Sequence, residues 1–417
     1  MNEPLIMKSF SIPNLFKSDL IGRIKEKRRI NDKLKKDFSP SVIDFGSVQI
    51  FLSRHFGFCY GVENAVEIAY RVIEEHPHKR IFLLSEMIHN PAVNADLQER
   101  GLKFIQDTKG NQLIEWDQLH VDDIVIVPAF GTTIEIQEKL SRLGIDPYSY
   151  DTTCPFVEKV WNRASSIGQK QYSVIVHGKP SHEETKATFS HSKENAPTLI
   201  LRDLKEAEKL VPFIRNEKST AEFFTAFAGQ YSKGFDPSKH LAKIGVVNQT
   251  TMLASDTQEI VELLKRTMID LYALEEHNLQ EHFADTRDTL CYATNDNQNA
   301  TYGLLKEEAD LVIVAGGYNS SNTSHLVELC EQKLPTYFIS SASKLVSKQE
   351  ILHFDIHQKS EVLSSGFIPN KSKVRVMLTC GASCPDAVVE EILRKLLSFF
   401  PTVENAEEVF ENWLEAN

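Results

Sequence analysis

Short apolar runs alternate with helical stretches from about residue 47 to residue 398. Most of these runs are continuously apolar, which is typical of strands that are covered on both faces. Several are followed at once by a helical pattern that opens with small or polar residues. We therefore expect an α/β fold with small, mostly parallel sheets. The predicted strands span residues 48–52, 80–84, 124–128, 173–176, 244–247, 311–314, 336–339 and 374–378.

The length of 417 residues suggests two to three domains, because a single core seldom grows so large. The alternation predicts α/β lobes over residues 46–154, 155–290 and 291–398, with a charged insertion at about 203–240. A basic extension precedes them over 1–45, and an acidic tail follows over 399–417. An apolar stripe in the tail predicts an amphipathic helix that docks on the body or on a second chain. The stripe consists of Val409, Phe410, Trp413 and Leu414.

Composition narrows the class of protein. The net charge of −12 repels phosphate backbones, so we expect no nucleic-acid partner, and any phosphate site must be local. No apolar run approaches the roughly 20 residues of a membrane helix, so we expect a soluble protein without a membrane partner. Acidic residues within the basic extension favour a solvated helix over a secretion signal. Six scattered cysteines do not form a disulfide framework, which favours a reducing cytoplasm.

Three cysteines lie at turns between a predicted strand and a helix, where a helix dipole favours a thiolate. They are Cys59 in FGFCYGV, Cys154 in DTTCPFVEKV and Cys291 in DTLCYATNDNQ. Isolated cysteines are usually small buried hydrophobes, which we expect for Cys330 within a helical pattern. Cys380 and Cys384 form a CxxxC without a second pair at zinc spacing, and we expect a structural placement. Three thiolates from three lobes would suit a cubane cluster with one open iron.

Polar side chains gather at other predicted strand ends. His89 opens a helical pattern in IHNPAVN, and VHGKPSHEETKAT contains His182 and Glu184. A carboxylic acid beside histidines and a phosphate is what proton delivery requires, although a solvated loop has the same composition. Turns rich in hydroxyls follow in NQTTM, GGYNSSNTSH and CGASCPD, where such groups bind phosphate or simply cap a helix. Neither GxGxxG opening a helix nor GxxxxGK[ST] occurs, so a nicotinamide, flavin or ATP site is not indicated.

Nine motifs in order resemble the family of LytB/IspH-type 4-hydroxy-3-methylbut-2-enyl diphosphate reductases, which catalyse the last step of the methylerythritol phosphate route to isoprenoids. They extend from about residue 50 to residue 398. The resemblance implies three α/β lobes around a central cleft, with one 4Fe–4S cluster held by Cys59, Cys154 and Cys291. The motifs are FGFCYGV, IHNPAVN, AFGTT, DTTCPFV, HGKPSHEET, NQTT, CYATNDNQ, NSSNTS and GASCPD.

The resemblance also implies roles for the polar residues. Glu184 would deliver a proton, and Thr250, with Gln249 beside it, would orient the substrate hydroxyl. Two electrons, from a ferredoxin or flavodoxin, and two protons would then yield isopentenyl or dimethylallyl diphosphate. The basic extension would attract such an acidic carrier. The residues expected around the diphosphate are His89, His182, Asn319, Ser320, Ser321, Asn322 and Ser383.

Residue 130 departs from the commonest bacterial pattern. Those members have Ala-His-Gly where this chain has Ala129, Phe130 and Gly131, a difference that the plant and cyanobacterial branch shares. Phe130 cannot donate to phosphate, and His177 is a candidate replacement. Two other classes stay open. One is a cluster-bearing sensor without turnover, and the other is a three-lobed enzyme similar to quinolinate synthase or to the diphthamide-forming enzymes.

Overall fold

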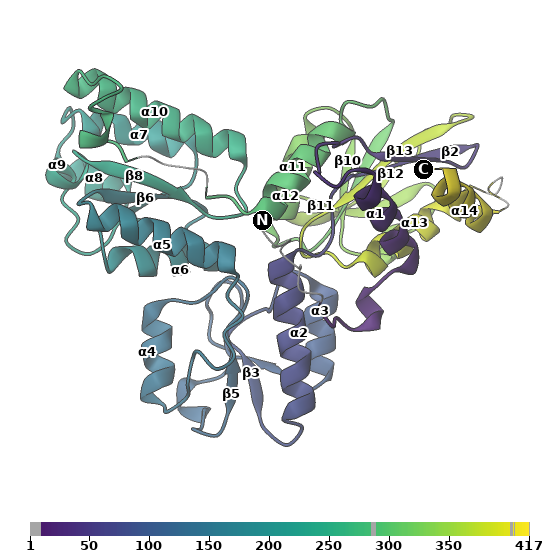
Figure 1. Cartoon of the computed structure of the whole chain (residues 1–417), viewed down its shortest axis with the longest axis horizontal. Coiled ribbons are helices and arrows are strands. Elements are labelled where there is room, and N and C mark those ends of the chain that lie inside the picture. Colours follow the sequence, from purple (N-terminus) through teal and green to yellow (C-terminus); the bar gives the residue numbers. More distant parts are fainter. Residues whose placement is uncertain (1–9, 285–288, 401–402, 404, 417) are drawn as a thin grey trace, which may run out of the picture. The chain divides into compact units, whose positions relative to one another are not determined.

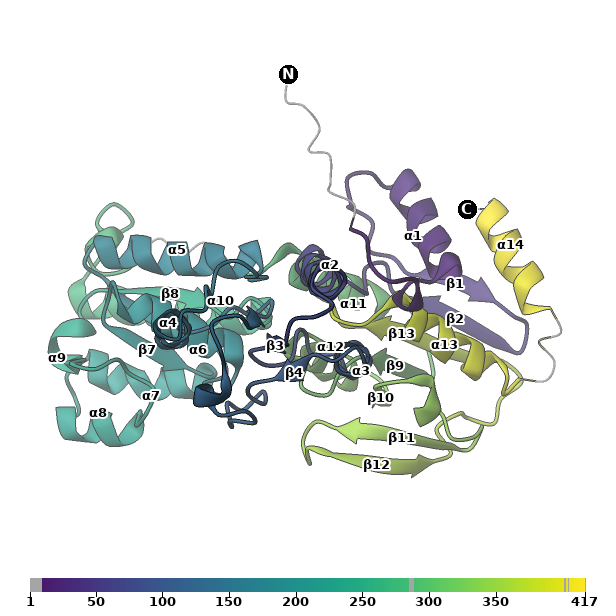
Figure 2. The same cartoon turned by 90° about the horizontal axis from the view of Figure 1, so that it is seen from below.

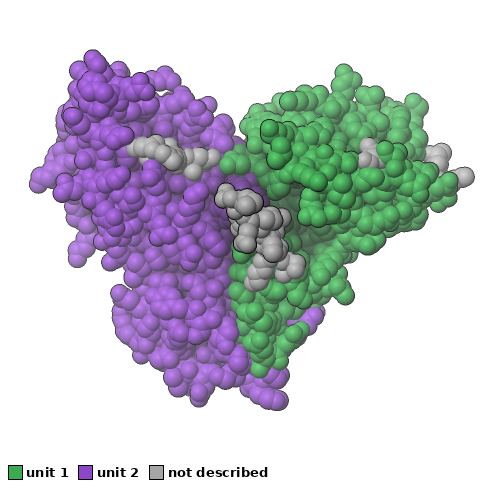
Figure 3. Space-filling view, viewed as in Figure 1, with its two compact units in different colours: residues 1–75, 88–96, 295–417 green, residues 76–87, 97–294 purple. Residues whose placement is uncertain are grey.

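The structure is a computed structural model that describes residues 10–284, 289–400, 403 and 405–416. The chain divides into two compact units (Figure 3). Unit 1 consists of residues 1–75, 88–96 and 295–417, and unit 2 consists of residues 76–87 and 97–294. Both are α/β, as the alternation of apolar runs and helical patterns predicts.

Unit 1 is built on a sheet with the strand order β1-β2-β13-β9-β10 (Figure 1). β1 pairs with β2 in antiparallel fashion, and the other neighbours pair in parallel. Val48 of β2 stands opposite Val374 of β13, so residues 48–52 lie in one sheet with the strands predicted for the third lobe, not with those of 81–126. The strands are β1 (Ser41–Asp44), β2 (Val48–Leu52), β9 (Leu311–Ala315), β10 (Thr336–Ile339) and β13 (Val374–Cys380).

Helices α1, α13 and α14 pack their apolar residues against one face of this sheet. Figure 2 shows α1 and α14 beside β1. Phe410 of α14 is buried against Phe45, with ring centroids 5.1 Å apart, so the prediction that the tail docks on the body is confirmed for its described residues. The helices that lie wholly or partly in unit 1 are α1 (Asp19–Asn31), α2 (Tyr60–Glu75), α3 (Pro91–Glu99), α11 (Tyr292–Leu304), α12 (Ser321–Glu331), α13 (Asp386–Leu397) and α14 (Ala406–Ala416).

The basic extension differs from the solvated helix that its composition predicts. Leu20, Ile21 and Ile24 of α1 are buried in the core of unit 1, because they recur at helical spacing on one side of the helix. Cations on its other side are paired: Arg23 contacts Glu411 at 2.6 Å, for example. The extension from Ser18 onward is therefore part of the folded unit.

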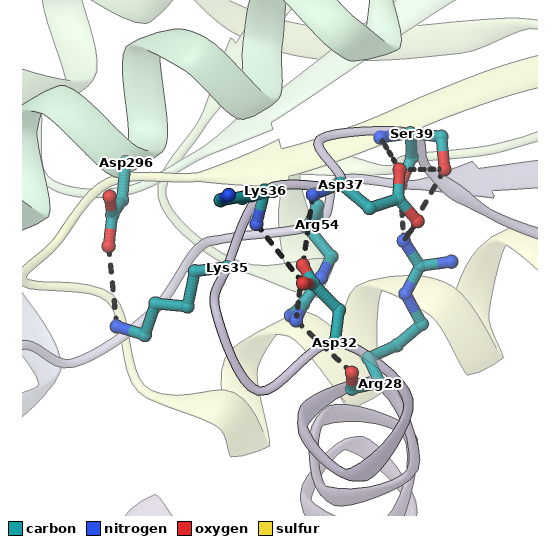
Figure 4. A network of polar contacts seen from close by, with 8 residues as sticks. All are labelled: Arg28, Asp32, Lys35, Lys36, Asp37, Ser39, Arg54 and Asp296. Carbon is teal, nitrogen blue, oxygen red and sulfur yellow. Dashed lines mark hydrogen bonds and ion pairs between the residues drawn. The ribbon is translucent and has the colours of Figure 1, made fainter.

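The end of α1 is tied to the connection between β2 and α2 (Figure 4). Asp32 accepts hydrogen bonds from two backbone N–H groups of the following turn and lies 3.8 Å from the buried guanidinium of Arg54. Arg54 in turn donates to the carbonyl of Arg28 at 3.2 Å. Arg54 precedes Cys59 in the same connection, so the extension helps to fix the backbone that leads to this cysteine.

Unit 2 contains two small parallel sheets, with the orders β4-β3-β5 and β7-β6-β8 over the described residues. Each of the eight predicted strands of the chain is present, with ends that differ by at most two residues. The strands of unit 2 are β3 (Ile81–Leu83), β4 (Lys103–Phe104), β5 (Ile124–Ile126), β6 (Ser173–His177), β7 (Thr198–Leu201) and β8 (Ile244–Asn248).

The predicted insertion at about 203–240 is the crossover between β7 and β8. It folds into α7, α8 and α9, and its fully buried Phe223 and Phe227 belong to one core with α10. None of the helices in the described ranges is both long and apolar enough to cross a membrane. The helices of unit 2 are α4 (Ile134–Arg142), α5 (Pro155–Gln169), α6 (Glu183–Lys193), α7 (Leu204–Ile214), α8 (Thr220–Ala226), α9 (Pro237–His240) and α10 (Ala254–Tyr272).

Candidate functional site

The predicted functional residues lie at connections that lead into helices, mostly just after the carboxyl end of a parallel strand. Such ends are the usual place for ligands in open α/β sheets. Unit 1 carries Cys59, His89, Asn319, Ser320, Ser321, Asn322 and Ser383. Unit 2 carries Cys154, His182, Glu184, Gln249, Thr250 and Cys291.

The connection from β9 to α12 presents hydroxyls and an amide at a helix N-terminus. Ser320 is the N-cap, and its Oγ accepts a hydrogen bond from the N–H of Thr323 at 3.2 Å. Gly316 has a φ of +154°, and a Cβ built there would lie 2.6 Å from Oγ1 of Thr323. The glycine therefore permits the close approach of the strand end to the first helical turn. Unpaired N–H groups of such a turn attract anions.

Two side-chain groups of this helix start are buried without a hydrogen-bond partner among the described residues, namely Oγ of Ser321 and Nδ2 of Asn322. Asn322 is oriented by its other amide atom, since Oδ1 accepts the N–H of Ala382 at 2.9 Å. A buried donor without a partner costs about 1–3 kcal/mol. Two such donors beside the helix N-terminus fit an anionic ligand that supplies the missing acceptors.

The turn after β13 connects four of the predicted residues in unit 1. The carbonyl of Ala382 accepts the N–H of Cys59 at 3.2 Å, while the N–H of Ala382 donates to Asn322. Ser383 donates its hydroxyl to the backbone carbonyl of His89 at 3.0 Å. One turn therefore positions a candidate cluster ligand and three candidate diphosphate ligands. Asn319 is exposed beside this group.

Glu184 is the carboxylate of unit 2 with the most complete set of donors at a predicted site. Its side chain is on the first turn of α6 and only 2% exposed. One oxygen accepts the backbone N–H of Thr250 at 2.5 Å, and the other accepts the Thr250 hydroxyl at 3.0 Å. The carboxyl group predicted for proton delivery thus lies against the hydroxyl predicted to orient the substrate. The pair forms because β6 and β8 are neighbours and end at the same edge.

His182 is the N-cap of α6, and its Nδ1 accepts the N–H of Glu184 at 3.2 Å. Phe130 packs edge-on against the His182 ring, with centroids 5.9 Å apart. The residue that departs from the bacterial pattern therefore supports a candidate diphosphate ligand. His177 is buried at the end of β6, where its Nδ1 lies 2.9 Å from the hydroxyl of Thr257 on α10. This contact gives His177 a structural role.

Gln249 is also held by the protein. Its Oε1 accepts the N–H of Lys179 at 3.2 Å and the hydroxyl of Thr185 at 2.9 Å, while Nε2 donates to Thr251 at 2.6 Å. The side chain is fully buried. These contacts tie the connection after β8 to the connection after β6, so they fix Thr250 relative to Glu184.

Two of the candidate cluster ligands lie in unit 2. Cys154 is the N-cap of α5, and Pro155 follows at the first helical position. Sγ of Cys291 accepts the N–H of Thr294 at 3.2 Å, and the Cys291 N–H donates to the carbonyl of Thr250 at 3.4 Å. Burial, and then the neighbouring Cys291 and Glu184, raise the pKa of Cys154 to about 12. Without a metal, this thiol is therefore protonated at neutral pH.

Exposure separates the cysteines into two sets. Cys59, Cys154 and Cys291 are half-buried and free, whereas Cys330, Cys380 and Cys384 are buried and free. Burial of Cys330 within α12 confirms the prediction for that residue. A hydrogen bond to Cys380, together with burial, raises the pKa of Cys384, which places the two thiols of the CxxxC side by side in the core.

Sequence reasoning missed the residues that support the candidate ligands. Thr294 contacts Cys291 Sγ through its N–H and through its hydroxyl, at 3.1 Å, and Thr323 anchors the Ser320 cap. Thr185 holds Gln249. Each lies within five residues of a predicted ligand on the following helix, and this spacing is the signal that would have found Thr294 and Thr323.

The fold and these residues define a class: an α/β protein with half-buried cysteines and an anion site at strand-to-helix connections. The family model described as LytB protein matches residues 50–397, and the chain belongs to this family. The resemblance stated above is thereby confirmed.

Relatives with curated names agree. The 4-hydroxy-3-methylbut-2-enyl diphosphate reductase of Thermosynechococcus vestitus is 38% identical, over 88% of this chain and 92% of its own length. That of Gloeobacter violaceus is 36% identical, over 89% of this chain and 90% of its own length. The matches include further cyanobacterial proteins, such as that of Trichodesmium erythraeum at 37% identity over 94% and 92% of the two chains.

Two solved structures share the fold. The E-1-hydroxy-2-methyl-but-2-enyl-4-diphosphate reductase of Plasmodium falciparum superimposes with a TM-score of 0.61 at 21% identity, over 85% of this chain and 89% of that chain. A second reductase, described as the terminal enzyme of the non-mevalonate pathway, gives a TM-score of 0.50 at 22% identity, over 84% and 99%.

Proposed function

We propose that the chain is an oxidoreductase that converts 4-hydroxy-3-methylbut-2-enyl diphosphate into isopentenyl and dimethylallyl diphosphate. The reaction consumes two electrons and two protons, breaks the C–O bond of the allylic hydroxyl and releases water. Family membership over residues 50–397 supports the substrate and the reaction. The observation that carries the proposal to individual residues is the buried Glu184 carboxylate held by both donors of Thr250.

Glu184 and Thr250 handle the proton in this proposal. Two hydrogen bonds fix the carboxyl group in one orientation, and one of them comes from a hydroxyl that can pass a proton on. Thr250 thereby orients the substrate hydroxyl and relays the proton from Glu184. Burial of the pair keeps bulk water from competing for this contact.

The diphosphate is bound by groups from both units. Ser320, Ser321 and Asn322 contribute the helix start with its two unpartnered buried donors, which supports an anion there. Ser383 and His89 adjoin this helix start through the turn after β13. His182 and Asn319 complete the proposed set, while Gln249 acts by holding the connections in place.

We assign one 4Fe–4S cluster per chain to Cys59, Cys154 and Cys291. These residues fit because they are the free, half-buried cysteines of the chain, and because N–H groups stabilise the sulfur of Cys291. When bound, such a cluster supplies electrons and an open iron for the hydroxyl. The chain itself positions the sulfurs through caps and turns: Cys154 by the start of α5, and Cys59 by the turn after β13.

The electrons require a donor, and we propose a small acidic or flavin-bearing carrier of the ferredoxin or flavodoxin type. The paired cations of α1 do not favour the extension as its docking surface, since Arg23 and Lys25 already contact Glu411 and Asp386. A cytoplasmic location is supported by the six cysteines, all of which lie in described parts of the chain and are free.

The test is anaerobic purification followed by iron and sulfide analysis and an assay with a chemical reductant. We expect about four irons per chain and formation of both isomeric diphosphates. Cys154→Ser should lose iron and all turnover, because the electron path is removed. Cys330→Ala, which changes a buried cysteine in α12, should keep both.

A full cluster without turnover would favour the sensor that lacks catalysis. It would equally suit another three-lobed enzyme, and substrates of that class would then be tried. Absence of iron after anaerobic reconstitution would contradict the proposed cofactor. Loss of iron in Cys330→Ala as well would assign the effect to folding rather than to ligation.

A further inference from the structure

The anion-binding connection after β9 contains little that would make it rigid by itself. It begins with Gly316 and Gly317, and glycine leaves the backbone freest. Neither position accepts a larger residue: a Cβ on Gly317 would lie 2.3 Å from the carbonyl oxygen of His89, and one on Gly316 would contact Thr323. The next residue, Tyr318, must therefore fix this connection before Asn319 and Ser320 begin the binding turn.

Tyr318 is held by a hairpin that stands outside the main sheet, formed by β11 (Glu350–Asp355) and β12 (Ser360–Ser365). In unit 1 the hairpin lies beside β10 (Figure 2). Phe354 of β11 stacks on the Tyr318 ring at 4.6 Å with an interplanar angle of 13°. Phe338 of β10 packs against the same ring edge-on at 5.1 Å.

A polar contact completes the attachment. The Tyr318 hydroxyl donates to Oε1 of Glu361 on β12 at 2.7 Å, and the ammonium of Lys344 lies 2.5 Å from the same oxygen. The ring is thus fixed by stacking, and its rotation about the binding turn is fixed by the hydrogen bond. An aromatic stack and a charge-assisted hydrogen bond are each directional, which a purely apolar contact is not.

We infer that the β11–β12 hairpin sets the position of the diphosphate-binding turn through Tyr318, and that Tyr318 and Glu361 are positioning residues for this ligand. The inference rests on the proposed function. Neither side chain touches the substrate. Their effect is to hold the backbone N–H groups and hydroxyls after residue 318 in the geometry that binds a diphosphate, so that little order must be created on binding.

The test measures binding of inorganic diphosphate to the anaerobic holoenzyme by calorimetry, together with KM and kcat for the allylic substrate. Tyr318→Leu removes the stack and the hydroxyl, whereas Tyr318→Phe removes only the hydroxyl. Glu361→Gln removes the charge of the acceptor. Tyr337→Phe is the matched control, because Tyr337 packs edge-on against His353 of the same hairpin at 5.1 Å but does not adjoin the binding turn.

We expect Tyr318→Leu to raise both the Kd for diphosphate and the KM by about 10-fold, as loss of an aromatic stack and a hydrogen bond implies. Tyr318→Phe and Glu361→Gln should each raise them by about 3-fold, and the double variant should show no more than either alone. The kcat should stay within about 2-fold, and Tyr337→Phe should match the wild type.

An unchanged Kd in Tyr318→Leu and Tyr318→Phe would overturn the inference, and so would a fall in kcat with KM unchanged. An equal loss of affinity in Tyr337→Phe would also overturn it, because the hairpin would then matter only for general stability. A wild-type protein that turns over the substrate while these variants behave normally would leave the proposed function intact. A wild-type protein that neither binds diphosphate nor turns over would overturn both.

Discussion

In unit 1, the start of α12 keeps Oγ of Ser321 and Nδ2 of Asn322 buried without a partner among the described residues. In unit 2, both oxygens of Glu184 accept hydrogen bonds from Thr250. The two places have the same topology, since each lies where a parallel strand gives way to a helix. Their hydrogen bonding is opposite: one place has donors in excess, and the other satisfies its acceptors internally.

The difference follows from what each place has to do. An anion brings its own acceptors, so a binding site gains affinity from donors that the empty protein leaves unpaired. A proton donor needs a single orientation, which internal hydrogen bonds provide before the substrate arrives. Unit 1 therefore carries the larger cost in the absence of ligand, about 1–3 kcal/mol for each buried unpaired donor, and unit 2 carries the reacting carboxyl group.

The largest expected effect comes from Glu184→Gln. The amide keeps the shape and one acceptor but cannot donate a carboxylic proton, so kcat should fall by about 10² to 10⁴-fold. The affinity for inorganic diphosphate, measured by calorimetry, should be unchanged. Glu183→Gln is the matched control on the same helical turn and should leave kcat near that of the wild type. A variant that binds diphosphate poorly but retains kcat would reverse the roles assigned to the two units.

Ser321→Ala and Asn322→Ala should act on binding. Removing one donor to a charged ligand weakens binding by about 10-fold, and we expect this change in the diphosphate Kd and in KM with kcat nearly constant. Ser321→Ala should also leave the free energy of unfolding without ligand equal or higher, because an unpaired buried hydroxyl disappears.

Thermal unfolding with and without inorganic diphosphate separates these contributions. The matched control is Ser324→Ala on the next turn of α12, where the hydroxyl already donates to the Ser320 carbonyl at 3.0 Å. If Ser321→Ala lowered stability without ligand while leaving the Kd unchanged, the hydroxyl would be structural, and the comparison of the units would lose its basis.

The two kinds of site differ in how far sequence leads to them. Strands such as β6, β8 and β9 are continuously apolar and five residues long, so their pattern identifies them and the polar residues that follow. The serines and asparagine of unit 1 are visible as a motif. That Ser321 and Asn322 keep unpaired donors, and that Glu184 meets Thr250, depends on which strands are neighbours.

Long-range pairing is also where the predicted fold differs from the structure. β2 pairs with β13 across more than 300 residues, a contact that no local pattern encodes, and it divides the chain into units that are not continuous. The hairpin β11–β12 was missed because its strands are polar and largely exposed, with a pattern typical of a loop. The burial of α1 was missed because its many cations mask the apolar side formed by Leu20, Ile21 and Ile24.

Phe130→His gives the smallest expected effect and tests the comparison from the other side. The change introduces a donor into unit 2, next to His182, where the ring of Phe130 now packs at 5.9 Å. An imidazole has an unperturbed pKa of about 6.5, so at pH 6 the added residue is mostly charged and at pH 8 it is neutral. Relative to the wild type at each pH, the diphosphate Kd should fall by about 3-fold at pH 6 and change little at pH 8. An increase in Kd at both values would mean that the Phe130 edge contact orients His182 more effectively than an extra donor binds the ligand.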